Sequence, residues 1–378
     1  MRMPNIGITC YPDQGGSGVV ATELGLHLAR HGCEVHFISS HLPFRLRSYA
    51  TNIFHHPVEL PEYPVFRSSP YTLSLATTMH DVARQHDLDI LHVHYAIPHT
   101  ASAFLAQQML QPTNLKVVTT LHGTDITLVG QEPSFFPMTR FLIERSDAVT
   151  AVSTFLKEET VRVFGVGEDM EVIPNFVDPR LFLPVQESEL RRRLAPKGEA
   201  LLLHASNFRA VKNVPTVVEV FRQARARHAV RLVLVGEGPE LKGIRRLVRE
   251  QGLQDDVVFL GPSDNLEEIL PVADILLLPS RHESFGLVAL EAMACGVIPV
   301  ATSVGGAGEF IVDGSNGFLR HPQDVGGMVE AVDGVLGNPA LKLNMAEDAR
   351  RDATLDFGAS CVIRQYLDLY EGLLSHQG

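Results

Sequence analysis

Short apolar runs alternate with amphipathic stretches of helical period along this chain. The run Ile-Leu-Leu-Leu at residues 275–278 is typical of a parallel strand that is buried on both faces, and the stretches between such runs are typical of covering helices. Alternation of this kind predicts an α/β fold built on parallel sheets.

The pattern is interrupted at residues 172–179, where Pro174 and Pro179 stand close together. Because proline interrupts regular structure, we place a domain boundary there. The expected domains are residues 1–175 and residues 176–356, and 378 residues suffice for two domains of ordinary size.

Each domain is expected to repeat strands and helices in turn. In an open parallel sheet, ligands meet the carboxyl ends of the strands, so the loops that follow the strands are the candidate binding loops. The expected strands lie at residues 5–10, 35–39, 89–94, 116–121 and 147–152, and then at 200–205, 231–235, 257–261, 275–279, 296–300 and 310–312.

The most informative loop follows the strand at 275–279. It contains Glu283 and leads to Gly286, which opens an expected helix. Free N–H groups at a helix start favour an anion, and Glu291 would lie about 7–8 Å along the axis, at ~1.5 Å per residue. This arrangement suits a diphosphate at the helix start and a ribose diol beside Glu291. The alternative is a helix with an acid near its start and a solvated Glu291.

Two cations, Arg209 and Lys212, follow the strand at 200–205. If they face the start of the Gly286 helix, they form a pocket for a diphosphate. The alternative is a pair of surface cations. The exit of the strand at 257–261, which contains Ser263, could border a base pocket.

In the first half, a glycine-rich turn at residues 15–18 joins a strand to an amphipathic helix and would let a ligand approach the backbone. It does not match G-x-G-x-x-G, and no acid follows the strand at 35–39, which disfavours a dinucleotide site. A tight turn without a ligand is the alternative.

Several polar residues of the first half would share one sheet edge. They are Ser17, Tyr95, Thr120 and His122, and His122 is followed by Gly-Thr-Asp. His92 is expected to be a hydrogen-bonded core residue. Arg140 is either a solvated helix charge or a clamp for a carboxylate.

Composition excludes some classes of protein. A net charge of −12 argues against a nucleic-acid binder, and no apolar run approaches the ~20 residues of a membrane span. The chain begins with a strand rather than a signal peptide, so we expect a cytoplasmic protein. Three of the four cysteines lie in apolar surroundings and are expected to be buried thiols, and the 17 histidines form no metal-binding motif.

Together these motifs resemble the GT-B retaining glycosyltransferases of the large GT4-like family that carries E-x7-E, here Glu283 and Glu291. The resemblance covers nearly the whole chain. Within that family, the chain resembles the N-acetylglucosaminyl malate synthases of bacillithiol biosynthesis. The segments that carry the resemblance are 15–18, 122–125, 209–212, 236–239, 283–291 and 313–317, and, for the subfamily, 11–12, 92–99 and Arg140 before 146–147.

The resemblance implies two Rossmann-like domains that face each other across a cleft, with the last helix, residues 357–378, packed back onto the first. It implies N-acetylglucosamine transfer from UDP-N-acetylglucosamine to the hydroxyl of L-malate, without a cofactor or metal, in a possible homodimer. The implied donor residues are Gly16, Asn207, Arg209, Lys212, Ser263, Glu283, Phe285, Gly286, Leu287 and Glu291; the acceptor residues are Ser17, Tyr95, Thr120 and Arg140; the catalytic residues are His122, Arg209, Lys212 and Glu283.

The chemistry of glycosyl transfer fits this set of residues. Charge develops on the departing UDP, and fixed cations stabilise it. Without a metal motif, Arg209 and Lys212 are expected to do what a metal does in other enzymes. Our hypothesis is that the donor phosphate takes the acceptor proton and that His122 shapes the sugar site.

Three alternatives remain at this point. The same fold could serve another acceptor, such as an inositol phosphate, a sugar or a lipid-linked sugar, for which Arg67 is the unassigned cation. A nicotinamide-dependent oxidoreductase is weakened by the missing dinucleotide motif. A UDP-sugar sensor without turnover would be expected to lack Glu283 or Lys212, and both are present.

Overall fold

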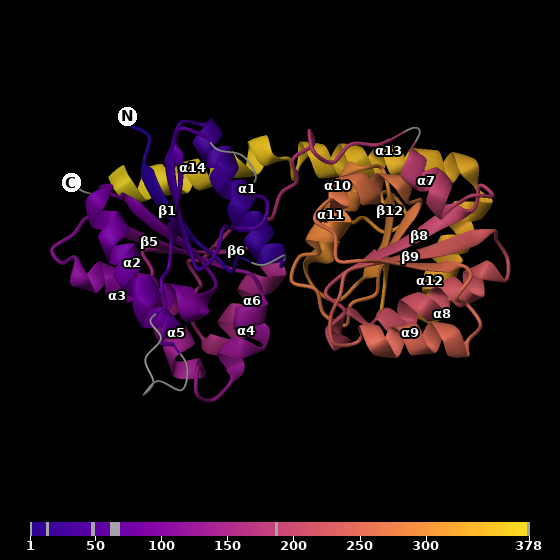
Figure 1. Cartoon of the computed structure of the whole chain (residues 1–378), viewed down its shortest axis with the longest axis horizontal. Coiled ribbons are helices and arrows are strands. Elements are labelled where there is room, and N and C mark those ends of the chain that lie inside the picture. Colours follow the sequence, from indigo (N-terminus) through magenta and orange to yellow (C-terminus); the bar gives the residue numbers. More distant parts are fainter. Residues whose placement is uncertain (1, 13–14, 47–49, 61–68, 186–187, 376–378) are drawn as a thin grey trace. The chain divides into compact units, whose positions relative to one another are not determined.

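The computed structural model describes residues 2–12, 15–46, 50–60, 69–185 and 188–375. Arg67 lies outside the described residues. The chain divides into two compact units (Figure 1). The N-terminal unit comprises Met1–Asn175 and Ser360–Gly378, and the C-terminal unit comprises Phe176–Ala359.

The N-terminal unit is built on a seven-stranded parallel sheet of order β3-β2-β1-β4-β5-β6-β7. The chain runs outward from β1 to β3 and then returns to continue from β4 on the other side of β1. The order therefore reverses between β1 and β4, and ligands of open parallel sheets bind at such a switch point. The strands are β1 (Asn5–Thr9), β2 (Glu34–Ser39), β3 (Ile53–Pro57), β4 (Ile90–His94), β5 (Lys116–Leu121), β6 (Ala148–Ala151) and β7 (Glu171–Val172).

Helices cover both faces of this sheet. Alternate residues of a strand point to opposite faces, so Leu91 and Val93 pack with α2 and α3 while His92 meets α14. The His92 ring is buried between the hydroxyls of Tyr370 and Thr120, which confirms its role in the core. The helices are α1 (Gly16–Arg30), α2 (Tyr71–Gln85), α3 (Ala101–Met109), α4 (Thr124–Thr127), α5 (Phe136–Arg145), α6 (Thr154–Phe164) and α14 (Ala359–Ser375).

The C-terminal unit repeats this topology with a six-stranded parallel sheet of order β10-β9-β8-β11-β12-β13. Its switch point lies between β8 and β11. Two parallel-sheet domains of Rossmann type confirm the predicted fold class. The strands are β8 (Ala200–Ala205), β9 (Val230–Val235), β10 (Val257–Gly261), β11 (Ile275–Leu278), β12 (Ile298–Thr302) and β13 (Phe318–Arg320).

The core of the C-terminal unit forms where helices pack on this sheet. On α8, Val217 and Phe221 stand one turn apart and are fully buried, together with Leu202 of β8 and Ile275 of β11. The helices are α7 (Glu189–Leu194), α8 (Val214–Arg225), α9 (Leu241–Glu250), α10 (Leu266–Ile269), α11 (Leu287–Ala294), α12 (Val325–Gly337) and α13 (Pro339–Leu355).

The predicted strand at 310–312 is wrong. The side-chain amide of Asn316 donates to the carbonyl oxygen of Phe310 at 3.1 Å, and its oxygen accepts from the N–H of Val312 at 2.7 Å. These bonds satisfy backbone groups that a strand would pair with a neighbour. The strand that pairs with β12 is instead β13, and the short strands β3 and β7 were not predicted.

The thiols of Cys10, Cys33 and Cys295 are buried as predicted, and Cys361 is exposed. All four are free. Within the described ranges, no helix has the length and apolar content to cross a membrane.

Candidate active site

At the switch point of the C-terminal unit, one ion pair joins the loops that follow β8 and β11. The Nζ atom of Lys212 lies 2.8 Å from the Oε2 atom of Glu283, and both side chains are largely buried. Lys212 ends a 3-10 turn, Ala210–Lys212, that begins five residues after β8. The structure therefore brings together two residues that are 71 positions apart in sequence, at the sheet position where ligands bind.

The loop that carries Glu283 is held by backbone hydrogen bonds. The N–H of Glu283 donates to the carbonyl of Val304 at 3.3 Å, and its own carbonyl accepts from the N–H of Gly306 at 2.9 Å. Between these residues, Gly305 has φ of 113°, and a Cβ there would lie 1.9 Å from the Glu283 carbonyl oxygen. Only glycine fits this approach, so the loop fixes Glu283 through the main chain.

Helix α11 starts beside this loop. Gly286 precedes it with φ of 98°, and no side chain caps the first turn. The first N–H groups of a helix carry partial positive charge, which favours an anion at this end of α11. Glu291 is only 4% exposed, so the solvated alternative for this residue is wrong. The Phe285 ring is also buried and lies 5.0 Å from the ring of Phe310.

The loop after β8 is shaped from both sides. The buried imidazole of His204 bridges the carbonyl of Leu277 and the hydroxyl of Ser206, each at 2.8 Å. On the other side, a Cβ at Gly238 would lie 1.9 Å from the carbonyl oxygen of Asn207. The close approach of Gly238 and the His204 bridge set the path of the chain toward Arg209.

The remaining donor candidates of this unit share the same edge. Asn207 is exposed, Arg209 is half-buried, and Arg209 has no carboxylate within ion-pair distance among the residues that the structure describes. Ser263 follows β10, two strands from β8, and its hydroxyl accepts from the N–H of Asn265 at 3.2 Å.

At the switch point of the N-terminal unit, aromatic rings lie where the C-terminal unit has its Lys212–Glu283 ion pair. The rings of Tyr11, after β1, and Tyr95, after β4, lie 5.3 Å apart, and Tyr95 stacks on His122 at 5.6 Å. Tyr95 has φ of 92°, a strained value for a residue with a side chain, and such strain concentrates at functional positions. The structure thus brings together Tyr95 and His122, which were predicted for one edge.

The other acceptor candidates differ in their surroundings. The Thr120 hydroxyl is buried and lies 2.7 Å from both His92 and Thr150, so the core already engages it. Ser17 lies in the first turn of α1, one residue after Gly16. Arg140 is exposed on α5 and pairs with Glu144 at 3.4 Å, as the solvated-charge alternative expects.

The histidines at this edge are neutral near pH 7. Burial lowers the pKa of His122 to about 3, and burial also lowers the pKa of His94. The Nε2 atom of His122 lies 2.8 Å from the Nδ1 atom of His94. Asp125 is buried beneath the same loop. Burial raises its pKa to about 6, and it accepts from the N–H groups of Gly123 and Ala96, which fixes the loop that carries His122.

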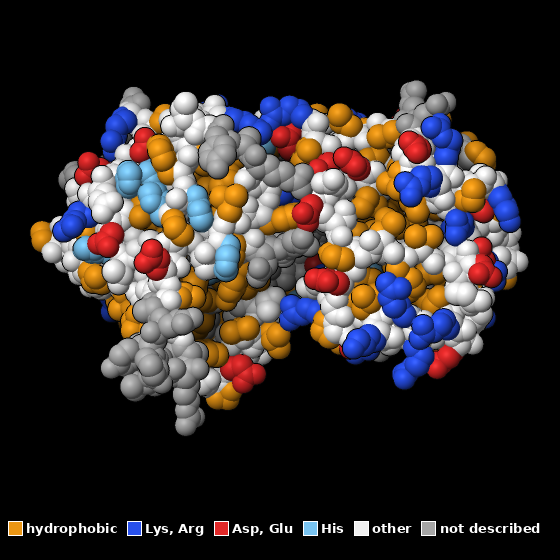
Figure 2. Space-filling view, in the orientation of Figure 1, with side chains coloured by type: hydrophobic (Ala, Val, Ile, Leu, Met, Phe, Trp, Pro, Cys, Tyr) orange, Lys and Arg blue, Asp and Glu red, His pale blue; other side chains and the backbone are white. Residues whose placement is uncertain are grey.

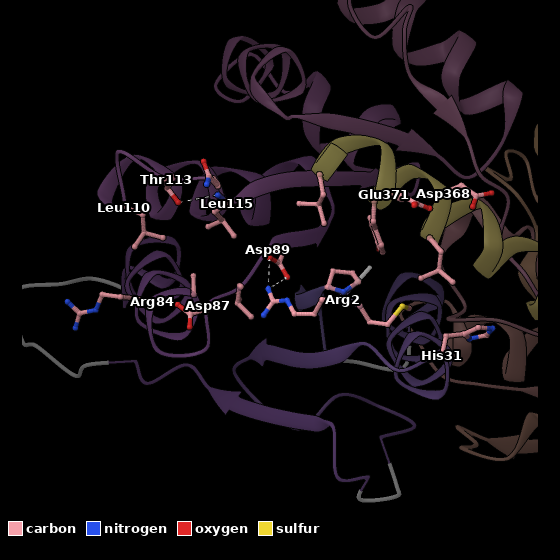
Figure 3. A pocket seen from close by; sticks show the side chains of 18 of the residues that line it. Arg2, His31, Arg84, Asp87, Asp89, Leu110, Thr113, Leu115, Asp368 and Glu371 are labelled. Carbon is pink, nitrogen blue, oxygen red and sulfur yellow. Dashed lines mark hydrogen bonds and ion pairs between the residues drawn. The ribbon is translucent and has the colours of Figure 1, made fainter. Parts of the chain in front are cut away.

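A cavity of about 890 Å³ opens at the opposite edge of the N-terminal sheet, near the amino ends of its strands (Figure 3). Arg2 and Asp89 pair within it at 2.9 Å, and Leu115 and Glu371 contribute to its walls. Because ligands of such sheets meet the carboxyl ends, this cavity is separate from the candidate site.

The sequence did not reveal two contacts of the site and one histidine cluster elsewhere in the N-terminal unit. It did not foresee the Lys212–Glu283 pair, the His94–His122 contact or a cluster of His36, His56 and His86 with metal-ligand spacing. The available signal was the presence of histidines on neighbouring strands: His92 and His94 share one face of β4, while His36 lies on β2 and His56 on β3.

Comparison with known proteins identifies the family. One family model, described as Glycosyltransferase Family 4, matches residues 14–181, and another, Glycosyl transferases group 1, matches residues 185–352. The N-acetyl-alpha-D-glucosaminyl L-malate synthase of Bacillus anthracis is 46% identical over 370 residues, which span 98% of this chain and 97% of that protein. This chain belongs to the same glycosyltransferase family.

Solved structures show that this glycosyltransferase has the GT-B fold. Sucrose-phosphate synthase from Thermosynechococcus elongatus superposes with a TM-score of 0.82 at 23% identity, over 98% of this chain and 99% of that one. Anabaena Alr3699/HepE in complex with UDP and glucose gives 0.80 at 20% identity, over 97% and 99%. Membership of the family sets aside the oxidoreductase alternative.

Proposed function

We propose that this glycosyltransferase moves N-acetylglucosamine from UDP-N-acetylglucosamine to the hydroxyl of L-malate, the first step of bacillithiol biosynthesis. The observation that carries the proposal is the 46% identity, over nearly the full length of both chains, to a relative whose name states this sugar and this acceptor. That name also specifies the alpha product. Because UDP-N-acetylglucosamine is an alpha-linked donor, transfer retains the anomeric configuration.

The edge of the C-terminal unit suits the donor. The start of α11 supplies N–H groups of Gly286 and Leu287 for the diphosphate, and Glu291, further along the same helix, is positioned to accept from the ribose hydroxyls. The burial of Glu291 strengthens these charge-assisted hydrogen bonds. Asn207, Ser263 and Phe285 complete the donor set of this unit.

Lys212 stabilises the leaving diphosphate together with Arg209. In the structure, Lys212 is held by Glu283, and Glu283 is held by its own backbone bonds. The ammonium group is therefore positioned before the reaction begins, and preorganised charge costs little reorganisation when negative charge develops. Glu283 is then available to accept from the sugar hydroxyls.

The transfer breaks the bond between the anomeric carbon and the β-phosphate oxygen, whose electron pair stays on UDP. The malate hydroxyl oxygen forms the new bond to that carbon, and its proton passes to the departing phosphate. A general base works best with a pKa near the working pH. Since burial lowers the pKa of His122 to about 3, His122 is a poor proton acceptor, and its ring shapes the sugar site.

The malate site is proposed for the N-terminal unit. Tyr95 and Ser17 offer hydroxyls, and Arg140 offers a guanidinium that can bind a carboxylate through two hydrogen bonds. The Arg140–Glu144 pair is exposed and water competes for it, so a substrate carboxylate can replace Glu144. Thr120 contributes by holding the β5 exit in place through its buried hydrogen bonds.

An acceptor screen tests this function. UDP release from UDP-N-acetylglucosamine is measured with L-malate, D-malate, inositol phosphate and simple sugars, and without an acceptor. We expect release that depends on L-malate and is weaker with D-malate. Faster release with inositol phosphate or a sugar would assign another acceptor to the same fold, and release independent of any acceptor would contradict the transfer.

The same proposal includes a cytoplasmic enzyme that works as a homodimer. Four free cysteines suit a reducing compartment. Sedimentation equilibrium of the purified chain distinguishes a dimer from a monomer of 41.5 kDa.

A further inference from the structure

Three histidines meet on the α2-facing side of the N-terminal sheet. Alternate residues of a strand share a face, so Glu34, His36 and Ile38 of β2 point to the same side, and Ile38 packs in the core with α2. In the parallel register, Ile38 stands opposite His56 of β3. The residue that follows α2, His86, completes the group.

The ring nitrogens lie close enough to share one ion. The Nδ1 atom of His36 is 2.9 Å from the Nε2 atom of His56, and one nitrogen from each of His36, His56 and His86 lies within 4.8 Å of the others. The His36 ring is buried, whereas His56 and His86 are half-buried, which leaves a path for an ion from solvent. Histidine side chains are visible on the surface of this unit in Figure 2.

A carboxylate orients the buried ring. The Oε1 atom of Glu34 lies 3.0 Å from the Nε2 atom of His36. When Nε2–H donates to Glu34, the lone pair of Nδ1 points toward His56. Metal-binding histidines in proteins commonly donate their second N–H to a carboxylate in this way, which fixes the tautomer and raises the basicity of the ligand.

We propose that His36, His56 and His86 form a binding site for one divalent transition-metal ion of the Zn²⁺ and Co²⁺ class. Imidazole nitrogen favours these ions over Mg²⁺ or Ca²⁺, which prefer oxygen ligands. The site would cross-link β2, the edge strand β3 and the end of α2. Its role is structural, because it lies on a helix-covered face of the sheet, apart from the Tyr95 and His122 edge.

The adjacent residue His55 provides a matched control. It belongs to the same strand but points to the other side, where its Nε2 atom lies 3.2 Å from the hydroxyl of Ser39. Stacked neutral rings without a metal are the competing explanation, since His36 also stacks on Phe54 at 4.9 Å. The test must therefore separate metal binding from packing.

The test uses the full chain after treatment with a chelator and dialysis, titrated with CoCl₂ or ZnCl₂ alone. We expect one Co²⁺ per chain, with the visible absorption of a tetrahedral or five-coordinate ion, and a rise in melting temperature with Zn²⁺. His86→Gln should weaken binding by roughly 100-fold or more, and Glu34→Gln by about 10–100-fold. His55→Gln should bind as the wild type does.

Circular dichroism checks that each variant is folded without metal. Equal Co²⁺ affinity and spectra for the wild type and His86→Gln would overturn the site, as would a wild type that neither binds one ion nor gains thermal stability with Zn²⁺. Loss of binding in His55→Gln to the same extent as in His86→Gln would also overturn it, because the ion would then be held elsewhere.

Discussion

The two units share one topology but equip the same sheet edge with opposite chemistry. At its switch point, the C-terminal unit places an ion pair, Lys212 and Glu283, beside the start of α11. The N-terminal unit places the rings of Tyr11, Tyr95 and His122 there. A fold therefore supplies the position of a site, whereas the loop residues decide what it can bind.

Burial explains much of the contrast. The Lys212 side chain keeps 21% of its surface exposed, and its charge is balanced by a carboxylate at 2.8 Å. Among the residues that the structure describes, no carboxylate pairs with the rings of His92, His94 or His122, and burial lowers the pKa of all three. The C-terminal edge therefore presents a balanced pair of charges, whereas the N-terminal edge presents neutral aromatic and imidazole rings.

The largest expected effect comes from removing the cation of the charged edge. Lys212→Ala should lower kcat by about 10²–10³, because loss of one contact to developing charge costs about 2.7–4 kcal/mol. Steady-state UDP release measures it, and Lys242→Ala, an exposed lysine of α9, is the control. Unchanged turnover would remove Lys212 from the mechanism.

A smaller effect is expected at the ribose. Glu291→Gln should raise the KM for the donor by about 10–100-fold, because hydrogen bonds to a charged group contribute about 1.5–3 kcal/mol. The control is Glu330→Gln on the exposed side of α12. Donor binding followed by calorimetry would contradict the role if the two variants bound UDP equally well.

The neutral histidines at the sheet edge of the N-terminal unit should make the free energy of unfolding depend on pH. A histidine whose folded pKa is about 3 stays neutral in the fold but takes a proton in the unfolded chain below its ordinary pKa of 6.5. Its contribution to stability is therefore complete above that value and is lost as the pH falls toward 3. Between pH 7 and 5, each such histidine should reduce the free energy of unfolding by about 2 kcal/mol.

Denaturant unfolding at pH 7 and pH 5 measures this dependence. His122→Asn should reduce the difference between the two pH values by about 2 kcal/mol, whereas the exposed His41→Gln should not change it. Asp125 acts in the opposite direction, since its raised pKa of about 6 favours the fold as the pH falls. A His122→Asn protein with the full pH dependence would show that this ring is not buried as a neutral group.

The smallest effect tests whether a change in helix α9 alters turnover at the loops that carry Lys212 and Glu283. Gly243 lies inside α9, and a Cβ there would meet no atom within 4 Å. Gly243→Ala should stabilise the protein by about 0.5–1 kcal/mol without changing kcat. Thermal unfolding and UDP release measure both quantities, and a fall in kcat would indicate coupling between α9 and the site.

The sequence predicted the parts of the fold that local patterns specify. The apolar runs located most strands, and the loops after them contained Lys212, Glu283, Tyr95 and His122. Pairing across the sheet was not predictable, because the distance between Lys212 and Glu283 depends on the order of strands rather than on either loop. The same reason hid the contact between His36 and His56, which arises from the register of two neighbouring strands.

Hydrogen bonds from one nearby side chain explain why the strand predicted at residues 310–312 does not form. Residues 310–312 are apolar and flanked by glycine-rich loops, a pattern typical of a strand. The Asn316 side chain instead satisfies their backbone, and the Phe310 ring packs on Phe285. A single side chain four to six residues away therefore decided the outcome, and apolar periodicity does not record such a contact.

The most direct measurement is the proton NMR spectrum of the product formed from UDP-N-acetylglucosamine and L-malate. The account predicts one product in which the anomeric proton has the small coupling of an alpha-linked sugar and the malate oxygen carries the new bond. A beta-linked product, or free N-acetylglucosamine with unmodified malate, would contradict it.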